Sequence, residues 1–179
     1  SVTLVNFLAS GMSAHMIGLL GGLGLAAGAA VWISTLRGIG QSSARLCDVL
    51  FGGRLHPTAL NLIATGALPI CFVAGLFGGF VPAAIAFAFL YGAGNGLLTI
   101  TRGTLPLVLF DPRTYGALVG RLLVPSFFLS AAAPLVYAVV IERFGDTAAL
   151  AMSLGIALVI VAAGIVLYTR FGRGPSSAS

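Results

Sequence analysis

Long apolar runs separated by short polar connections organise this chain. No Asp, Glu, Lys or Arg occurs between Arg54 and Arg102, and a second charge-free run covers residues 147–169. About 20 apolar residues are enough for a helix to cross a bilayer core that is roughly 30 Å thick. The first run has room for two crossings and the second for one. The pattern therefore predicts an integral membrane protein.

Glycine, proline and charged residues divide the apolar runs further. The uncharged stretch 1–36 is too long for one crossing, and the glycines between residues 18 and 24 divide it in two. Polar connections follow within 47–57 and 108–115, with shorter turns near residues 80 and 144. The sequence thus predicts an all-α membrane protein, a single bundle of six transmembrane helices at 2–20, 26–46, 58–77, 83–105, 116–141 and 148–168.

Composition excludes several other classes of protein. Hydrophobic residues make up 59% of the chain and charged residues only 7%, whereas a soluble domain is about 25% charged. The net charge of +5 does not indicate a nucleic-acid partner, because the arginines are spread between apolar runs rather than clustered with polar and aromatic residues. We expect the lipid bilayer to surround the protein and no nucleic acid to bind it.

No sequence pattern for metal, cofactor or enzymatic chemistry occurs. Cys47 and Cys71 have neither a CxxC spacing nor a histidine nearby, so neither a zinc site nor a disulfide framework is indicated. No phosphate-binding loop, catalytic triad, paired-carboxylate site or haem motif is present. The sequence therefore predicts no metal, no cofactor and no enzymatic activity.

Arginine distribution predicts the orientation in the membrane, because short cytoplasmic loops collect basic residues. All nine basic residues are arginines. If the first span leaves the cytoplasm, eight of them fall at inner ends and loops, including Arg37 and Arg45 in the last turns of the second span, and only Arg143 lies outside. We expect a multi-pass protein of the plasma (inner) membrane, with loops 47–57 and 108–115 and the C-terminal tail in the cytoplasm.

Three segments carry a resemblance to a known family. They are Tyr-Gly-Ala-Gly-Asn-Gly at 91–96, the stretch 38–46 with its continuation at 54–57, and Ala-Pro-Leu at 133–135 leading to Glu-Arg-Phe-Gly at 142–145. Over nearly its whole length the chain resembles the C-terminal six-helix half of a major facilitator superfamily transporter. The family's loop signature between the second and third helices is matched, with altered spacing, by Arg45, Asp48 and Arg54.

This resemblance implies half of a twelve-helix fold whose partner is an N-terminal six-helix half. The chain begins at Ser1 with no pattern of a signal peptide, and we expect it to begin partway through a longer polypeptide. The implied function is secondary active transport of a small-molecule substrate by alternating access. The alternative is a six-helix membrane protein of another class, such as a channel or an assembly or interaction protein.

Candidate pathway residues lie mainly in the fourth predicted span. Tyr91, Asn95 and Thr99 are spaced i, i+4 and i+8, and Arg102 follows close to the same helical face. Polar groups within a bilayer must pair inside the protein or line a wet cavity. This stripe is predicted either to contact substrate or to form hydrogen bonds between helices, and Arg102 either to bind an anion or to reach the interface.

Two further features have both a functional and a structural interpretation. His15, the only titratable group in the first span, has a side chain suited to proton coupling, or it is an interfacial or hydrogen-bonded histidine. Pairs of glycines with GxxxG spacing, among them Gly92 and Gly96, predict close helix packing. The sixth span contains Ser153 as its only hydroxyl before Tyr168, and we expect that helix to face lipid.

Overall fold

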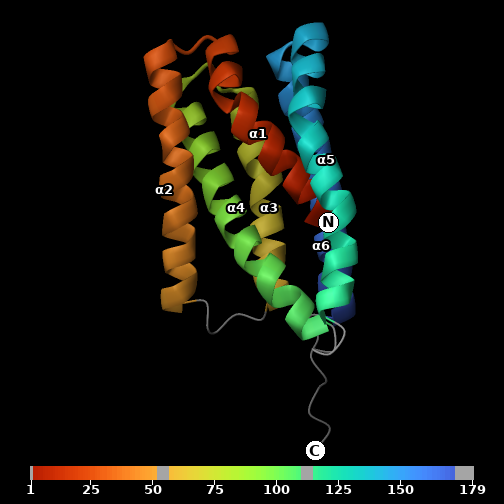
Figure 1. Ribbon diagram of the computed structural model, residues 1–179. Coiled ribbons are helices and arrows are strands. Elements are labelled where there is room, and N and C mark those ends of the chain that lie inside the picture. Colours follow the sequence, from red (N-terminus) through yellow and green to blue (C-terminus); the bar gives the residue numbers. More distant parts are fainter. Residues whose placement is uncertain (1, 52–56, 110–114, 172–179) are drawn as a thin grey trace, which may run out of the picture.

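The computed structural model describes residues 2–51, 57–109 and 115–171, and these residues form a bundle of six α-helices (Figure 1). The all-α fold class is confirmed, and no strand occurs in the described ranges. The helices begin within two residues of the predicted spans, and their ends range from one residue before to five residues after the predicted ones. They are α1 (Val2–Gly22), α2 (Ala27–Phe51), α3 (Pro57–Leu76), α4 (Val81–Leu109), α5 (Tyr115–Phe144) and α6 (Asp146–Phe171).

Five of these helices are long and apolar enough to cross a membrane by length and composition, and the chain is a multi-pass membrane protein. The helix outside this set is α2, which is less apolar because it carries Arg37, Arg45 and Asp48. It also runs five residues beyond the predicted end at residue 46. That extension places Arg37 nearer the middle of the helix than the predicted span did.

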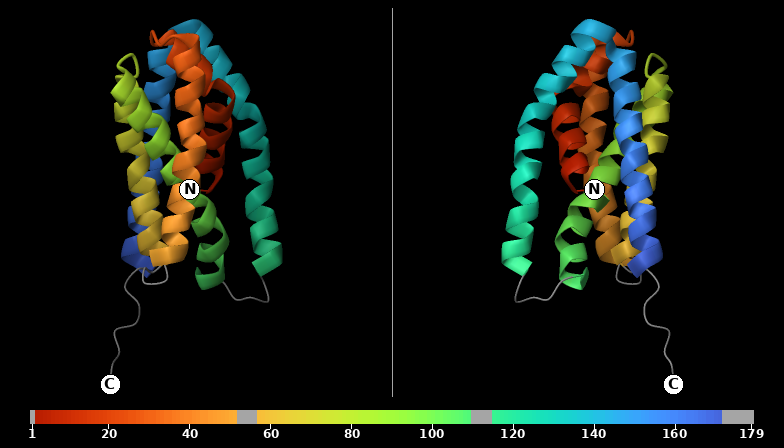
Figure 2. Two further views of the ribbon diagram at one scale, coloured as in Figure 1. Left: turned by 90° about the vertical axis from the view of Figure 1, so that its left-hand side faces the viewer. Right: turned by 90° about the vertical axis from the view of Figure 1, so that its right-hand side faces the viewer.

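The six helices pack against one another unequally. The most extensive contacts join α2 to α4, α3 to α4 and α1 to α5, followed by α3 to α6. Figure 2 shows α3 and α6 on one side of the bundle and α1 and α5 on the opposite side. The ends of α2, α4 and α6 lie at the same end of the bundle, as short loops between consecutive spans require (Figure 1).

Glycines bring α2 and α4 into backbone contact. A Cβ atom added at Gly92 would lie 2.0 Å from the carbonyl oxygen of Arg37, and one at Gly96 would lie 2.7 Å from that of Gln41. On the α2 side, a Cβ at Gly40 would lie 2.3 Å from the carbonyl oxygen of Phe89. The GxxxG pair at 92 and 96 therefore serves close packing, as its spacing predicts.

The outer surface of the bundle is largely apolar. On α3 the exposed side chains include Ile63, Ile70 and Val73, and on α6 they include Leu158 and Val159. A surface of this kind is typical of helices that contact the hydrocarbon core of a bilayer. One side of α6 is exposed and apolar, as expected of a helix that faces lipid, whereas its other side is buried in the core, where Ser153 is fully covered.

Candidate functional site

A line of polar side chains runs along α1. Asn6, Ser10 and Ser13 are spaced i, i+4 and i+7, so they share one face of the helix. Ser13 is exposed, while Asn6 and Ser10 are half-buried. These three residues were not among the predicted site residues, although their spacing was the signal that could have revealed them.

The line borders an open groove between α1 and α5. The groove has a volume of about 580 Å³ and is lined by Asn6, Ala9, Ser10, Ser13 and Ala14 of α1 and by Ser130 and Pro134 of α5. At its edge the side-chain amide of Asn6 donates to Ser126 Oγ of α5. The serines of α5 thus face the polar line of α1 and continue the polar surface onto a second helix.

A second groove lies between α1 and α2 and shares Ser13 with the first. Its volume is about 320 Å³. Its polar lining consists of Ser13, Ser34, Thr35, Arg37 and Gln41, and Met16 and Ile17 supply an apolar wall. Because Ser13 belongs to both grooves, the two form one polar surface that extends across α5, α1 and α2.

Arg37 is the charged group of this surface. Its Nη1 donates to Ser13 Oγ at 2.9 Å. Within the described residues this is its only hydrogen bond, and it forms no ion pair there. None of the residues that line either groove is acidic.

Arg37 lies near the middle of α2, whereas the predicted span 26–46 placed it in the last turns of the second span. It is the eleventh of the 25 residues of α2, so its Cα lies about 15 Å along the helix from Ala27 and about 21 Å from Phe51. The difference arises because α2 continues as a helix past Arg45 and Asp48 to Phe51.

In α4, Tyr91 is a core residue. Its side chain is 2% exposed, and its ring packs against Phe72 and Phe87 at centroid distances of 5.8 and 6.2 Å. Its hydroxyl donates to the backbone carbonyl of Leu8 in α1 at 3.2 Å. Tyr91 therefore satisfies its polar atom within the bundle and ties α4 to α1.

The rest of the predicted stripe is less buried. Thr99 is exposed and its hydroxyl donates to the backbone carbonyl of Asn95 at 2.7 Å, while the side chain of Asn95 is half-buried. Arg102 is half-buried too, and its Nε is a buried atom with no hydrogen-bond partner within the described part of the chain. Asp111, the acid nearest to it in sequence, lies outside the described residues.

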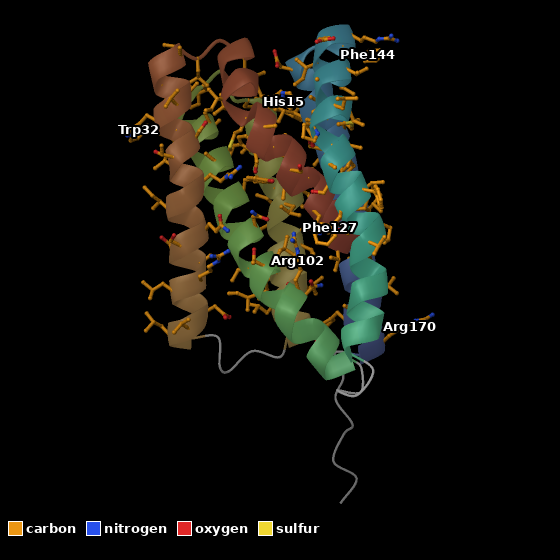
Figure 3. The ribbon with its side chains drawn as sticks, in the orientation of Figure 1. His15, Trp32, Arg102, Phe127, Phe144 and Arg170 are labelled. Atoms are coloured by element: carbon orange, nitrogen blue, oxygen red, sulfur yellow. The ribbon has the colours of Figure 1, made fainter. Side chains whose placement is uncertain are left out.

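His15 lies apart from the stripe, at a different level of the bundle from Arg102 (Figure 3). Its Nε2 is 2.9 Å from the carbonyl oxygen of Pro134, and its ring is stacked on that of Tyr137 with centroids 6.2 Å apart. A carbonyl oxygen only accepts hydrogen bonds, so Nε2 carries the hydrogen. His15 is thus a hydrogen-bonded histidine at the edge of the groove between α1 and α5.

Tyr137 extends this contact into the core. It is fully buried, and its hydroxyl is hydrogen-bonded to Ser153 Oγ of α6, which in turn donates to the backbone carbonyl of Ala149. Sequence reasoning missed this buried pair because a single hydroxyl in an apolar helix forms no pattern. The bond holds α5 and α6 together within the core.

The loop signature is only partly described. Arg45 is exposed and Asp48 is half-buried, both near the end of α2, while Arg54 lies outside the described residues. No group of three or more His, Cys, Asp or Glu side chains that would suit a metal ion occurs in the described ranges. Comparison of the chain with protein-family models, curated proteins and solved structures gave no match.

Proposed function

We propose that this bundle is one half of a secondary transporter that moves a small solute across the membrane by alternating access. The observation that carries the proposal is Arg37, a mid-span arginine without an ion pair among the described residues, on an open polar groove. A charged side chain near the centre of a bilayer is costly and normally faces a bundle interior or a water-filled cavity. The grooved face of α1 and α2 is therefore unsuited to lipid, in contrast to the apolar outer face of α3 and α6.

Helix pairing supports the same proposal. If the first three helices are matched with the last three, α1 corresponds to α4, α2 to α5 and α3 to α6. The contact of α1 with α5 then corresponds to that of α4 with α2, and both are among the most extensive in the bundle. Inverted three-helix repeats of this kind occur within each half of major facilitator transporters, which bind substrate near the midplane between the halves.

In this proposal a second six-helix half covers the grooved face in the full-length protein. The two grooves then line a central cavity between the halves, with Ser13 and Arg37 near its middle. Rocking of the halves exposes that cavity to one side of the membrane and then to the other. The transported solute binds to the polar surface and dissociates from it when the cavity opens to the other side of the membrane.

Cysteine accessibility in the full-length protein tests this mechanism without knowledge of the substrate. Exposed Cys47 is replaced by Ser, whereas fully buried Cys71 is kept. Ser10→Cys then places a single reactive thiol on the polar line, and Leu158→Cys places a control thiol on the apolar face of α6. A membrane-impermeant thiol reagent is applied from either side of sealed vesicles.

Alternating access predicts that Ser10→Cys reacts from both sides, and that a cross-link closing one end of the cavity removes labelling from that end only. Leu158→Cys should stay unreactive, because lipid excludes the reagent. An interaction protein with a dry interface would leave Ser10→Cys unreactive from both sides. A channel would also react from both sides, but it would conduct ions continuously until a cross-link closes it, which an alternating-access transporter does not do.

A further inference from the structure

We infer that the groove between α1 and α2 binds the oxyanion group, carboxylate or phosphate, of a small soluble solute, with Arg37 as its counter-charge. The inference rests on the proposed transport function and names the substrate class of that site. It also replaces Arg102 with Arg37 as the first candidate for the contact with an anion. Three observations carry it: the unused donors, the absence of acids in the lining, and the depth of the site.

Donors dominate the polar lining of the groove. A guanidinium has five N–H donors in a planar fork, and Arg37 uses one of them on Ser13. Ser13 accepts that bond, so its own hydroxyl hydrogen remains free for a ligand. The amide of Gln41 adds two more N–H donors to the same groove. A ligand with two adjacent acceptor oxygens satisfies such a set, because the fork binds carboxylate and phosphate in a bidentate manner.

Charge balance favours an anion over a neutral ligand. The full chain has four acidic residues. Asp48 lies 11 residues beyond Arg37 along α2, about 16 Å away, and Glu142 and Asp146 lie at the turn between α5 and α6. None of the described acids is paired with Arg37, and a bound oxyanion would supply the missing negative charge.

Depth and shape restrict the ligand to a small soluble molecule. Arg37 is about 15 Å or more from either end of α2 along the helix axis. If the ends of α2 lie at the two interfaces, the phosphate of a lipid headgroup does not reach the groove. The volume of about 320 Å³ is at the small end of the range for ligand pockets. Met16 and Ile17 add apolar surface to the lining, which suits an organic anion with a short apolar body.

Ligand-induced stabilisation of the full-length protein in dodecyl maltoside, a detergent without phosphate, tests the inference. Benzoate, acetate and inorganic phosphate are the probes, benzamide is the neutral analogue of benzoate, and ionic strength is held constant with chloride. At least one oxyanion should raise the unfolding temperature, and benzamide should not. Arg37→Gln should weaken the apparent affinity for that oxyanion about tenfold or more, as expected for loss of a hydrogen bond to a charged group. Arg143→Gln, at an exposed arginine on the outer turn, should leave the affinity unchanged.

A second measurement keeps the inference testable if Arg37→Gln fails to fold. Gln41→Cys, with Cys47 replaced by Ser, is alkylated by a water-soluble maleimide in the presence of each probe. The stabilising oxyanion should slow the reaction and benzamide should not. Stabilisation by no oxyanion, equal effects of benzoate and benzamide, or equal affinity in the parent and Arg37→Gln would each overturn the inference. If Ser10→Cys alternates between the two sides while no oxyanion binds, the transport proposal stands and the anion site falls.

Discussion

The glycine contacts between α2 and α4 predict a graded loss of stability. Alanine at Gly92 would place its Cβ 2.0 Å from the carbonyl oxygen of Arg37, and also 2.8 and 2.9 Å from the carbonyl carbon and Cα of that residue. All three are backbone atoms, so no side chain can rotate away. Contacts below 3.0 Å essentially do not occur for a Cβ, and the two helices must therefore separate by about 1 Å.

The magnitude follows from two opposing effects. Overpacking of a tight contact costs about 1–3 kcal/mol or somewhat more, and replacing a helical glycine by alanine gains about 1 kcal/mol in helix propensity. Gly92→Ala should therefore lower the free energy of unfolding by up to about 2 kcal/mol. Gly96→Ala, with a closest approach of 2.7 Å, should cost less. Gly103→Ala, on the same helix with nothing within 4 Å, should stabilise by up to about 1 kcal/mol.

Unfolding in mixed micelles of dodecyl maltoside and SDS, followed by circular dichroism, measures the three variants against the parent. The expected order of stability is Gly103→Ala, then Gly96→Ala, then Gly92→Ala. The separation of the first from the last should be about 1–3 kcal/mol, from the two effects above. If Gly92→Ala is as stable as Gly103→Ala, α2 and α4 do not approach through Gly92, and the packing described here is wrong.

Three further predictions concern the core, the stripe on α4 and the topology. Ser153→Ala should destabilise the protein by about 1–3 kcal/mol in the same unfolding assay, because it leaves the buried tyrosine hydroxyl of α5 without its partner. In the full-length protein, Asn95→Ala and Arg102→Ala should reduce substrate uptake at least severalfold while expression stays near normal. Single cysteines at Val49 and Phe144, exposed at opposite ends of the bundle, should react with an impermeant reagent from opposite sides of the membrane.

Each of these predictions has a matched control or a contrary result. Ser42→Ala, at an exposed serine of α2, should change stability by less than about 0.5 kcal/mol. If Ser153→Ala changes stability equally little, the hydrogen bond between Tyr137 and Ser153 does not stabilise the core. Arg102→Lys separates a bidentate contact, which it should impair, from an interfacial charge, which it should preserve. Normal uptake by Asn95→Ala and Arg102→Ala would show that these residues serve helix packing and do not contact the substrate. Three helices, α3, α4 and α5, separate Val49 from Phe144. Labelling of both cysteines from the same side would contradict the prediction that all three cross the membrane.

The fold was accessible from sequence because its signal is strong and local. Charge-free runs and their glycine and proline punctuation predicted six helices whose starts agree to within two residues. The end of α2 was harder, because Arg45 and Asp48 are compatible with a helix yet resemble the start of a loop. GxxxG spacing alone was a weaker guide: Gly92 and Gly96 both contact a neighbouring backbone, whereas Gly18 and Gly28 have open space around them.

The candidate site was less accessible, because it depends on contacts between distant segments. Arg37 was assigned to a helix end on the basis of an apolar window. Its place in α2 and its bond to Ser13, 24 residues away in sequence, instead put the cation near the middle of the helix, beside α1. Tyr91 belonged to a polar stripe by spacing but is an aromatic core residue by packing. Periodicity identifies a face of a helix, but it does not say whether that face meets another helix or open space.

The unequal packing of the helices has a mechanical consequence. Extensive contacts join α2, α3, α4 and α6 into one block, and α1 and α5 form a pair that touches this block less extensively. The bond from Arg37 to Ser13 and the bond from Tyr91 to Leu8 both cross the boundary between block and pair. A solute held by Arg37 and Ser13 at once would fasten the pair to the block, and its departure would leave the boundary secured by fewer polar contacts. A ligand shifts a conformational equilibrium of a protein only if it binds the two conformations with unequal affinity. Binding at this boundary would therefore change the position of α1 and α5 relative to the block more than binding elsewhere in the bundle.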